Sequence, residues 1–149
     1  MLGSTTEGVS NMGIRIRNLH NFVISLKYTK TLTATVEQDV SVVPFAGFIS
    51  NIVAKLGNTG SGSTNSVVDI NLNGTTIFST ATKITLAATT GVATYSPLAT
   101  KPTALAAGDV ISMDIDQISV APRNLVVQVT VTRTPIDDAS NVADHDDVY

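Results

Sequence analysis

The most regular feature of the chain is an alternation of apolar and polar residues between positions 22 and 37. The apolar set falls on even numbers: Phe22, Ile24, Leu26, Tyr28, Leu32, Ala34 and Val36. The odd-numbered residues are polar, and only Lys30 on the apolar side and Val23 on the polar side break the pattern. A period of two places each set on one face of a β-sheet. Because a usual strand has about 5–6 residues, we expect either a bend near Thr29–Thr31 or a strand that runs between two neighbouring bodies.

Shorter alternating stretches follow along the chain and are separated by turn signals. The strands that they predict are 45–56 with a bend or bulge at Gly47, 66–73, 75–79, 83–86, 92–95, 110–118 and 124–133, besides a short strand at 14–17. Asn73-Gly74 is typical of a two-residue hairpin turn, and Gly108 suits a turn with a positive φ angle. No stretch has the apolar spacing of an amphipathic helix. The pattern predicts an all-β fold, an antiparallel β-sandwich of the jelly-roll kind.

Composition agrees with this fold class and gives a domain organisation. The 149 residues include 21 Thr, 18 Val and 12 Ile, the β-branched residues that pack well in sheets. We expect an extended N-terminal arm or strand segment at 1–39, a β-sandwich domain at 40–136 and an acidic C-terminal tail at 137–149. No apolar run approaches the roughly 18 residues of a membrane span, so no membrane partner is expected. The first residues show no secretory signal.

The net charge of −3 divides unevenly along the chain. Residues 137–149 hold five Asp and no Lys or Arg, whereas residues 1–136 hold nine basic and seven acidic residues. A nearly neutral body lacks the clustered basic face that nucleic acid requires, so no nucleic-acid partner is expected. The tail is either a solvated end or an acidic strip that docks on a basic partner surface. In the second case Asp144, Asp146 and Asp147 are candidate partner-binding residues.

Few residues are available for catalysis or metal binding. The chain has no Cys, and its two His are His20, in a predicted turn, and His145, in the acidic tail. No Gly-x-Ser-x-Gly stretch or phosphate-binding glycine loop is present. The run 144–147 lacks the spacing of a preorganised calcium loop. We therefore expect no catalytic residue, no cofactor and no built metal site.

One pair of carboxylates has a spacing that could serve a glycosidase. Asp114 and Asp116 lie on the same face of a predicted strand, about 7 Å apart by strand rise, within the range that glycoside hydrolysis uses. A solvated strand face explains the same residues, and the chain has no Trp to form a sugar platform. A glycoside hydrolase is kept as an alternative that predicts loss of activity in Asp114→Asn.

Four stretches carry a resemblance to a known family. They are Pro44–Ile49, Ser66–Phe78 with its Asp-x-Asn-x-Asn-Gly sequence, and Ala107–Ile111 with its Ala-Gly-Asp sequence, followed by Asn124–Arg133. Over residues 43–133 the chain resembles the small β-sandwich domains of tailed-bacteriophage capsid decoration (cement), head-fibre and tail-fibre proteins. The resemblance implies a non-enzymatic virion protein, often trimeric, that an N-terminal segment holds on the capsid. It carries over no catalytic residues.

These observations lead to a first hypothesis and an alternative. The hypothesis is a capsid cement subunit on the virion surface, a homotrimer whose arm, with Arg15 and Arg17, docks on the major capsid protein. Twenty extended residues reach about 65 Å, enough to cross a subunit boundary. The alternative is a tail-fibre or receptor-binding module, with glycan as a candidate ligand of the Gly/Ser-rich loop Gly57–Asn65.

Overall fold

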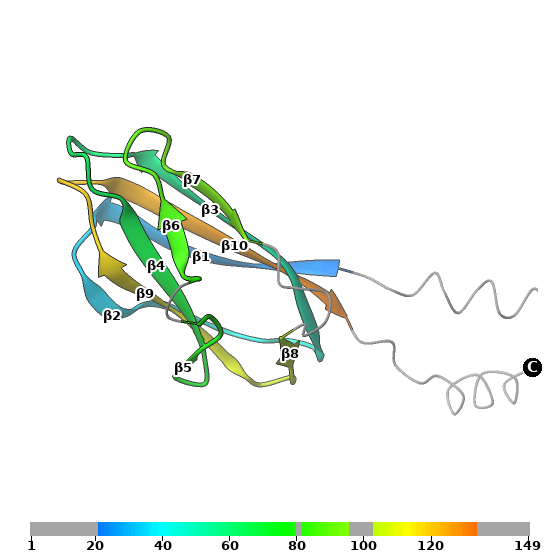
Figure 1. Ribbon diagram of the computed structural model, residues 1–149. Helices are drawn as coiled ribbons and strands as arrows, with labels where there is room; N and C mark the ends of the chain where they lie inside the picture. The colour runs from blue at the N-terminus through cyan, green and yellow to red at the C-terminus, as the bar shows by residue number, and fades with distance from the viewer. Residues whose placement is uncertain (1–20, 80–81, 96–102, 134–149) are drawn as a thin grey trace, which may run out of the picture.

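The computed structural model describes residues 21–79, 82–95 and 103–133 (Figure 1). In these ranges the regular elements are β1 (Asn21–Thr31), β2 (Thr35–Val42), β3 (Gly47–Asn58), β4 (Ser66–Leu72), β5 (Thr75–Thr76), β6 (Ile84–Leu86), β7 (Val92–Tyr95), β8 (Ala104–Leu105), β9 (Val110–Gln117) and β10 (Arg123–Arg133). The described ranges contain no helix long and apolar enough to cross a membrane. The predicted all-β class is confirmed. Within these ranges, the short strand β8 and residues 38–42 of β2 fall where the sequence predicted no strand.

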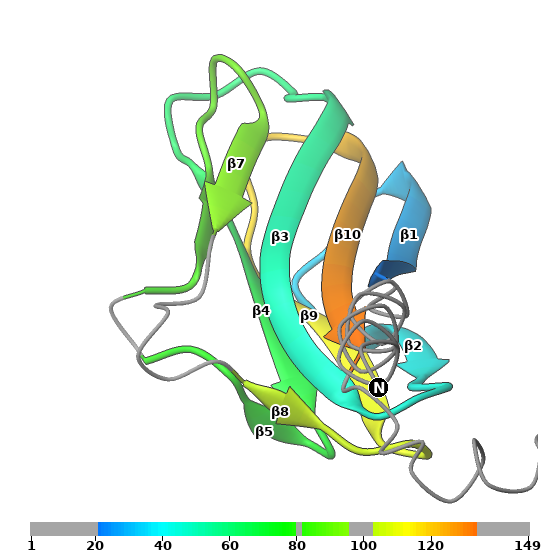
Figure 2. The same ribbon diagram turned by 90° about the vertical axis from the view of Figure 1, so that its right-hand side faces the viewer.

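The strands form two antiparallel sheets. Sheet A has the order β1-β10-β3-β7, with β8 also paired to β3, and sheet B has the order β2-β9-β4-β5, with β6 also paired to β4. The first strand thus pairs with the last, and the second strand with the last but one. This is the strand order of a jelly roll, so the predicted sandwich is confirmed. Figure 2 shows β7, β3, β10 and β1 of sheet A side by side, with β4 and β9 of sheet B behind them.

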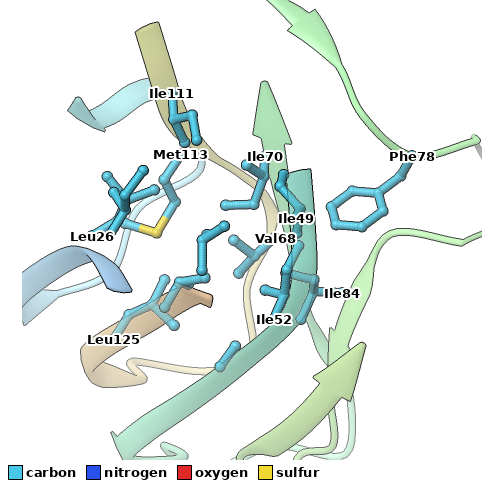
Figure 3. Packing of buried hydrophobic residues seen from close by; sticks show 14 of the residues in the cluster. Leu26, Ile49, Ile52, Val68, Ile70, Phe78, Ile84, Ile111, Met113 and Leu125 are labelled. Carbon is cyan, nitrogen blue, oxygen red and sulfur yellow. The ribbon is translucent and has the colours of Figure 1, made fainter. Parts of the chain in front are cut away.

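The space between the sheets is filled by aliphatic side chains. Alternate residues of each long strand point inward, and Ile52, Leu125, Ile70 and Met113 have no exposed surface. The first two come from sheet A and the last two from sheet B (Figure 3). Burying one such side chain stabilises the fold by roughly 1.5–3 kcal/mol. The apolar side chains that point inward from the alternating strands are therefore the main source of the stability of the fold.

Residues 21–39, which the sequence analysis joined to the arm, are integral to the sandwich. β1 pairs with β10 from Asn21↔Thr132 to Thr31↔Arg123, and β2 pairs with β9. The β1–β10 register shifts between Tyr28 and Thr31, where a bend was expected. The chain then passes from sheet A to sheet B. Because both halves of the long alternation pair with central strands, residues 21–39 belong to the sandwich together with the residues from 40 onward.

The alternation does not keep one face buried through this crossing. Val36 shares its parity with Phe22 and Ile24 but is 73% exposed. Glu37 has a φ angle of 50°, and the β2–β9 register shifts between Thr35 and Asp39. Thr35 pairs with the buried Ile115 and Asp39 with the buried Met113, so the odd-numbered residues of β2 face inward on both sides of this shift and Val36 faces outward. The parity therefore changes before β2, in the crossing that follows the buried Leu32. The expectation that Val36 lies on the buried face is therefore wrong.

The sequence analysis singled out Asn73-Gly74 and Gly47 as turn or bulge positions. Asn73 and Gly74 have φ angles of 50° and 79°, as a type I′ turn requires, and they join β4 to β5. At Gly47 a Cβ atom would collide with the Thr132 carbonyl oxygen, so only glycine lets β3 start this close to β10. A register shift follows in the same pair of strands, between Thr130 and Val131. The extra residue is Ser50, between Ile49 and Asn51, so this strand is irregular near its start but not at Gly47 itself, where the bend or bulge was expected.

Candidate functional site

A polar network covers the centre of the outer face of sheet B. Lys83 Nζ lies 2.8 Å from Asp69 Oδ2 and 2.6 Å from Asp116 Oδ2. Thr76 Oγ1 donates a hydrogen bond to Asp69 Oδ1 at 2.6 Å. The hydrogen bonds to Asp116 and Asp69 raise the pKa of Lys83 well above its ordinary value. Only 5% of the Asp69 side chain is exposed, so this carboxylate depends on the network for its partners.

Asp114 organises the neighbouring part of the same face. Its Oδ1 accepts a hydrogen bond from the Glu37 backbone N–H, and its Oδ2 accepts one from Asn71 Nδ2, both at 2.7 Å. The side chain thereby connects β2, β9 and β4. Asp114 and Asp116, considered above as a glycosidase pair, have separate partners: backbone and amide groups for Asp114, and Lys83 for Asp116. Each carboxylate thus stabilises contacts between strands.

Asp69, Asn71 and Ser112 alternate with the apolar residues of their strands and are polar, yet they are not solvated. All three are buried, because they lie on the central strands β4 and β9 and are flanked by strands on both sides. Sequence reasoning also missed Lys83. Its only local signal is a single cation just before a short strand, in a chain whose outward Asp residues recur two positions apart. No group of three or more His, Cys, Asp or Glu in the described part of the chain could hold a metal ion.

The two motifs that carried the family resemblance meet at one end of sheet B. Asn73 Nδ2 donates to Asp109 Oδ1 at 2.9 Å, and the Val110 N–H donates to Asn73 Oδ1 at 2.9 Å. Asp109 Oδ2 accepts the Ala106 N–H at 2.7 Å, which closes the turn around Gly108, whose φ angle is 91°. The hydrogen bond from Asn73, followed by that from Ala106, lowers the pKa of Asp109. Both motifs therefore fix turns.

The outer face of sheet A has a different character. Here Thr, Ser, Gln and Val side chains surround two exposed lysines, and no acidic residue is present on any strand of this sheet. Lys27 pairs with Val126, Val126 with Lys55, and Lys55 with Val92, so these four residues form one row across the sheet. We call this surface the basic face; it includes Val23, Lys27, Phe48, Lys55, Val92 and Val126.

The charged residues of the sandwich are sorted by sheet. The strands of sheet A carry five basic residues and no acid: Lys27, Lys30, Lys55, Arg123 and Arg133. The strands of sheet B carry five acidic residues and no base: Glu37, Asp39, Asp69, Asp114 and Asp116. Lys83 and Asp109 directly precede strands of sheet B. A body that is nearly neutral by count is thus strongly polarised between its two faces.

The candidate partner-binding residues Arg15, Arg17, Asp144, Asp146 and Asp147 lie outside the described residues, as do both histidines. The structure does place the positions from which the two terminal segments continue. Asn21 and Thr132 are paired neighbours in sheet A. Next to them the Phe22 and Phe45 rings meet edge to face with centroids 6.2 Å apart, and the Arg133 guanidinium lies 4.4 Å from the Phe45 centroid. Both terminal segments therefore continue from one end of sheet A.

The Gly/Ser-rich loop Gly57–Asn65 is held by several hydrogen bonds. The Ser61 N–H donates to the Val120 carbonyl at 2.9 Å, and the Gly60 N–H donates to Asn58 Oδ1 at 2.7 Å. At its end Asn65 Oδ1 accepts the Ala88 N–H at 3.1 Å. A Cβ atom at Gly60 would collide with the Val120 carbonyl oxygen, so the close approach requires glycine. These contacts fix the path of the loop at the end of the sandwich.

No protein-family model matches the chain, and no curated protein sequence does. Among solved structures it is similar to a chain of the acid-stable capsid of Helicobacter pylori bacteriophage KHP30, with a TM-score of 0.51 and 10% identity over 78% of this chain and 89% of that chain. A catalytic unit of an α-1,3-glucanase from Streptomyces thermodiastaticus gives a TM-score of 0.44 and 10% identity over 78% of this chain and 26% of its own. A family 35 carbohydrate-binding module from Clostridium thermocellum gives a TM-score of 0.38 and 16% identity over 72% of this chain and 90% of that chain. The similarity to the phage capsid chain supports the assignment of an antiparallel β-sandwich fold.

Proposed function

We propose that this protein is a structural component of a tailed-phage virion, a cement subunit that binds the major capsid protein on the capsid surface and stabilises the head. The observation that carries the proposal is the jelly roll shared with a chain of a phage capsid, of which 89% is matched. That chain is therefore close to this domain in size, as a separate subunit would be, rather than a large protein with a small inserted sandwich. Jelly rolls are common in viral capsids, and this support is an analogy of fold.

The chemistry of the sandwich supports a role without catalysis. The carboxylates at the centre of sheet B bind Lys83, Thr76, Asn71 and backbone amides, so their hydrogen-bonding capacity serves the fold. A cement protein must be stable and adhesive, and a densely paired jelly roll with a large aliphatic core provides the first property. We propose a homotrimer, in keeping with the family resemblance.

The copy number in the virion tests the proposed role. A cement subunit copurifies with full virions at a number comparable to that of the major capsid protein, and quantitative mass spectrometry of purified particles measures it. Sedimentation of the free protein measures whether it is a trimer. A few copies per particle would contradict the cement role and favour the tail-fibre or receptor-binding alternative. Binding of the free protein to host cells or glycan arrays would then confirm that alternative.

Truncation tests the role of the arm. Deleting residues 1–20 leaves every described strand intact, so the protein should fold with an unchanged thermal midpoint but lose binding to capsid shells. Arg15→Ala/Arg17→Ala in the full chain should weaken the same binding, and deletion of 137–149 tests the acidic tail with Asp144, Asp146 and Asp147. Co-sedimentation with shells measures all three variants. Wild-type affinity of the first variant would exclude the arm as the attachment segment.

A further inference from the structure

We propose that the basic face of sheet A is a docking surface whose partner is an acidic, carboxylate-bearing protein surface. The identification of that partner with the outer surface of the capsid shell rests on the function proposed above. The inference goes beyond the arm, because it assigns a contact to the folded body and states its chemistry.

The lysines of the basic face are available for a partner. Lys27 and Lys55 flank Val126 on neighbouring strands, and both side chains are exposed. Neither forms an ion pair within the described residues, whereas Lys83 on sheet B binds two carboxylates. No strand of sheet A carries an acid that could neutralise them. Asp39 of β2 reaches β1, but its Oδ2 accepts the Lys27 backbone N–H at 2.6 Å and forms no ion pair with the lysine ammonium. Two cations without an ion-pair partner in the described structure favour a partner that supplies the carboxylates.

Exposed apolar side chains lie on the same face. Val23, Val92 and Phe48 are 54%, 46% and 36% exposed, and they are interspersed with Thr, Ser and Gln. Apolar surface with few charges is typical of the central part of a protein interface. A nucleic acid would need a denser set of cations, since each neutralised phosphate takes one basic side chain. The composition of the face therefore favours a protein surface.

A second copy of this chain is a poorer partner than a foreign acidic surface. The acidic side of a second copy is sheet B, but Asp69 and Asp116 already bind Lys83, and Asp114 accepts two hydrogen bonds. Asp39 accepts the Lys27 and Val40 N–H groups, which leaves Glu37 as the one exposed acid on the described strands of this sheet without such a bond. Removing these carboxylates from their partners would offset the gain of new ion pairs. Opposite charges on the two sheets would instead orient the whole sandwich as it approaches an acidic surface, with sheet A leading.

The test is co-sedimentation of the full-length protein with shells of its major capsid protein at low and high salt. Lys27→Glu/Lys55→Glu should weaken binding at least about tenfold at low salt, because like charges then face each other. Lys30→Glu/Arg123→Glu is the matched control: it changes the net charge equally and lies at the end of sheet A, where Thr31 pairs with Arg123. It should bind much more tightly than the first variant. Equal thermal midpoints would show that both variants fold.

The outcomes separate this inference from the proposed function. If the wild type binds shells and both double variants bind as it does, the docking surface is wrong while the cement role stands. If the wild type does not bind shells, the cement role and the shell as partner are both wrong. Equal weakening of both variants would show a general charge effect and would also overturn the assignment to Lys27 and Lys55.

Zero-length carbodiimide cross-linking gives a direct measure of the contact. In the complex, mass spectrometry should find Lys27 or Lys55 joined to an Asp or Glu of the shell protein. Cross-links from these lysines to Glu37 or Asp116 of another copy would show that the face binds a second copy, which would overturn the proposal. Cross-links that join the shell only to sheet B would overturn it as well.

Discussion

On the outer face of sheet B, carboxylates, an ammonium group and amides bind one another, whereas the lysines on the outer face of sheet A have no ion-pair partner in the described structure. The inner faces of the two sheets, by contrast, contribute the same kind of aliphatic side chain to one core. Two strands that alternate in the same way can therefore serve different purposes on their outward side. Sheet B uses its polar groups to hold the jelly roll together, and sheet A leaves them exposed.

The difference between the sheets also explains why the near-neutral net charge of residues 1–136 gave no indication of a charged surface. The connection from β1 to β2, and then from β2 to β3, moves the chain between sheets, so oppositely charged residues that are near in sequence fall on opposite faces. Lys27 and Glu37 are ten positions apart, yet they belong to sheets A and B. A partner that contacts only one sheet interacts with the charges of that sheet, and the net charge of the whole body does not describe this contact.

The largest expected effect concerns the shared core and tests whether the inner faces are equivalent. Leu125→Ala in sheet A and Ile70→Ala in sheet B each remove a fully buried side chain. Each should lower the free energy of unfolding by about 2–5 kcal/mol, through lost burial and the cavity that remains. Urea unfolding measures both, with the exposed Val23→Ala as a control that should change stability by less than about 0.5 kcal/mol. A small effect in only one sheet would break the equivalence.

An intermediate effect distinguishes the two outer faces. Lys83→Met removes the cation shared by Asp69 and Asp116, whereas Lys55→Met removes a lysine with no ion-pair partner in the described ranges. The first should cost about 2–3 kcal/mol of unfolding free energy, less than the roughly 3–5 kcal/mol of a fully buried pair, because 24% of the Lys83 side chain is exposed. The second should change stability by less than about 0.5 kcal/mol. Equal losses in urea unfolding would contradict the contrast between the faces.

The smallest effect concerns the turn cluster at the end of sheet B. Asn73→Ala removes the main cause of the lowered pKa of Asp109, which should rise toward its ordinary value of about 3.9. A carboxyl group whose pKa is lowered by folding stabilises the fold above its unfolded pKa and loses that contribution as the pH falls through the folded value. The wild type should therefore lose more stability on acidification than the variant. An NMR titration of the Asp109 carboxyl carbon measures the shift, and an unchanged pKa would show that Asn73 has no influence.

Much of the fold could be predicted from local patterns. The strands at 66–72, 110–117 and 123–133 and the Asn73-Gly74 turn agree with the sequence analysis to within about two residues, because alternation and turn chemistry act over short distances. The face of Val36 and the strand β8 could not be predicted in this way. Val36 is exposed because the crossing from sheet A to sheet B, between Leu32 and Thr35, changes which parity faces inward, and β8 exists only because Ala104 and Leu105 lie beside β3.

The network on sheet B shows the same limit for the site. The period of two puts Asp69 and Asn71 on the side of their strand opposite to Val68 and Ile70, but the sequence does not say how much of that side its neighbours cover. Asp114 and Asp116 have a spacing that suits catalysis, and their partners Asn71 and Lys83 are remote in sequence. Spacing within a strand is local information, whereas the partners across strands depend on the topology.

By itself the sequence determined the β class, the positions of most strands and turns, and which side chains of a strand share a face. Those properties follow from φ/ψ preferences and a period of two, which need no distant contact. Only the tertiary structure decided that residues 21–39 belong to the sandwich, which polar side chains are buried and how the charges are sorted. These depend on pairings such as β1 with β10 and β4 with β9, which join residues far apart in the chain. The jelly-roll connection collects the basic strands in one sheet and the acidic strands in the other.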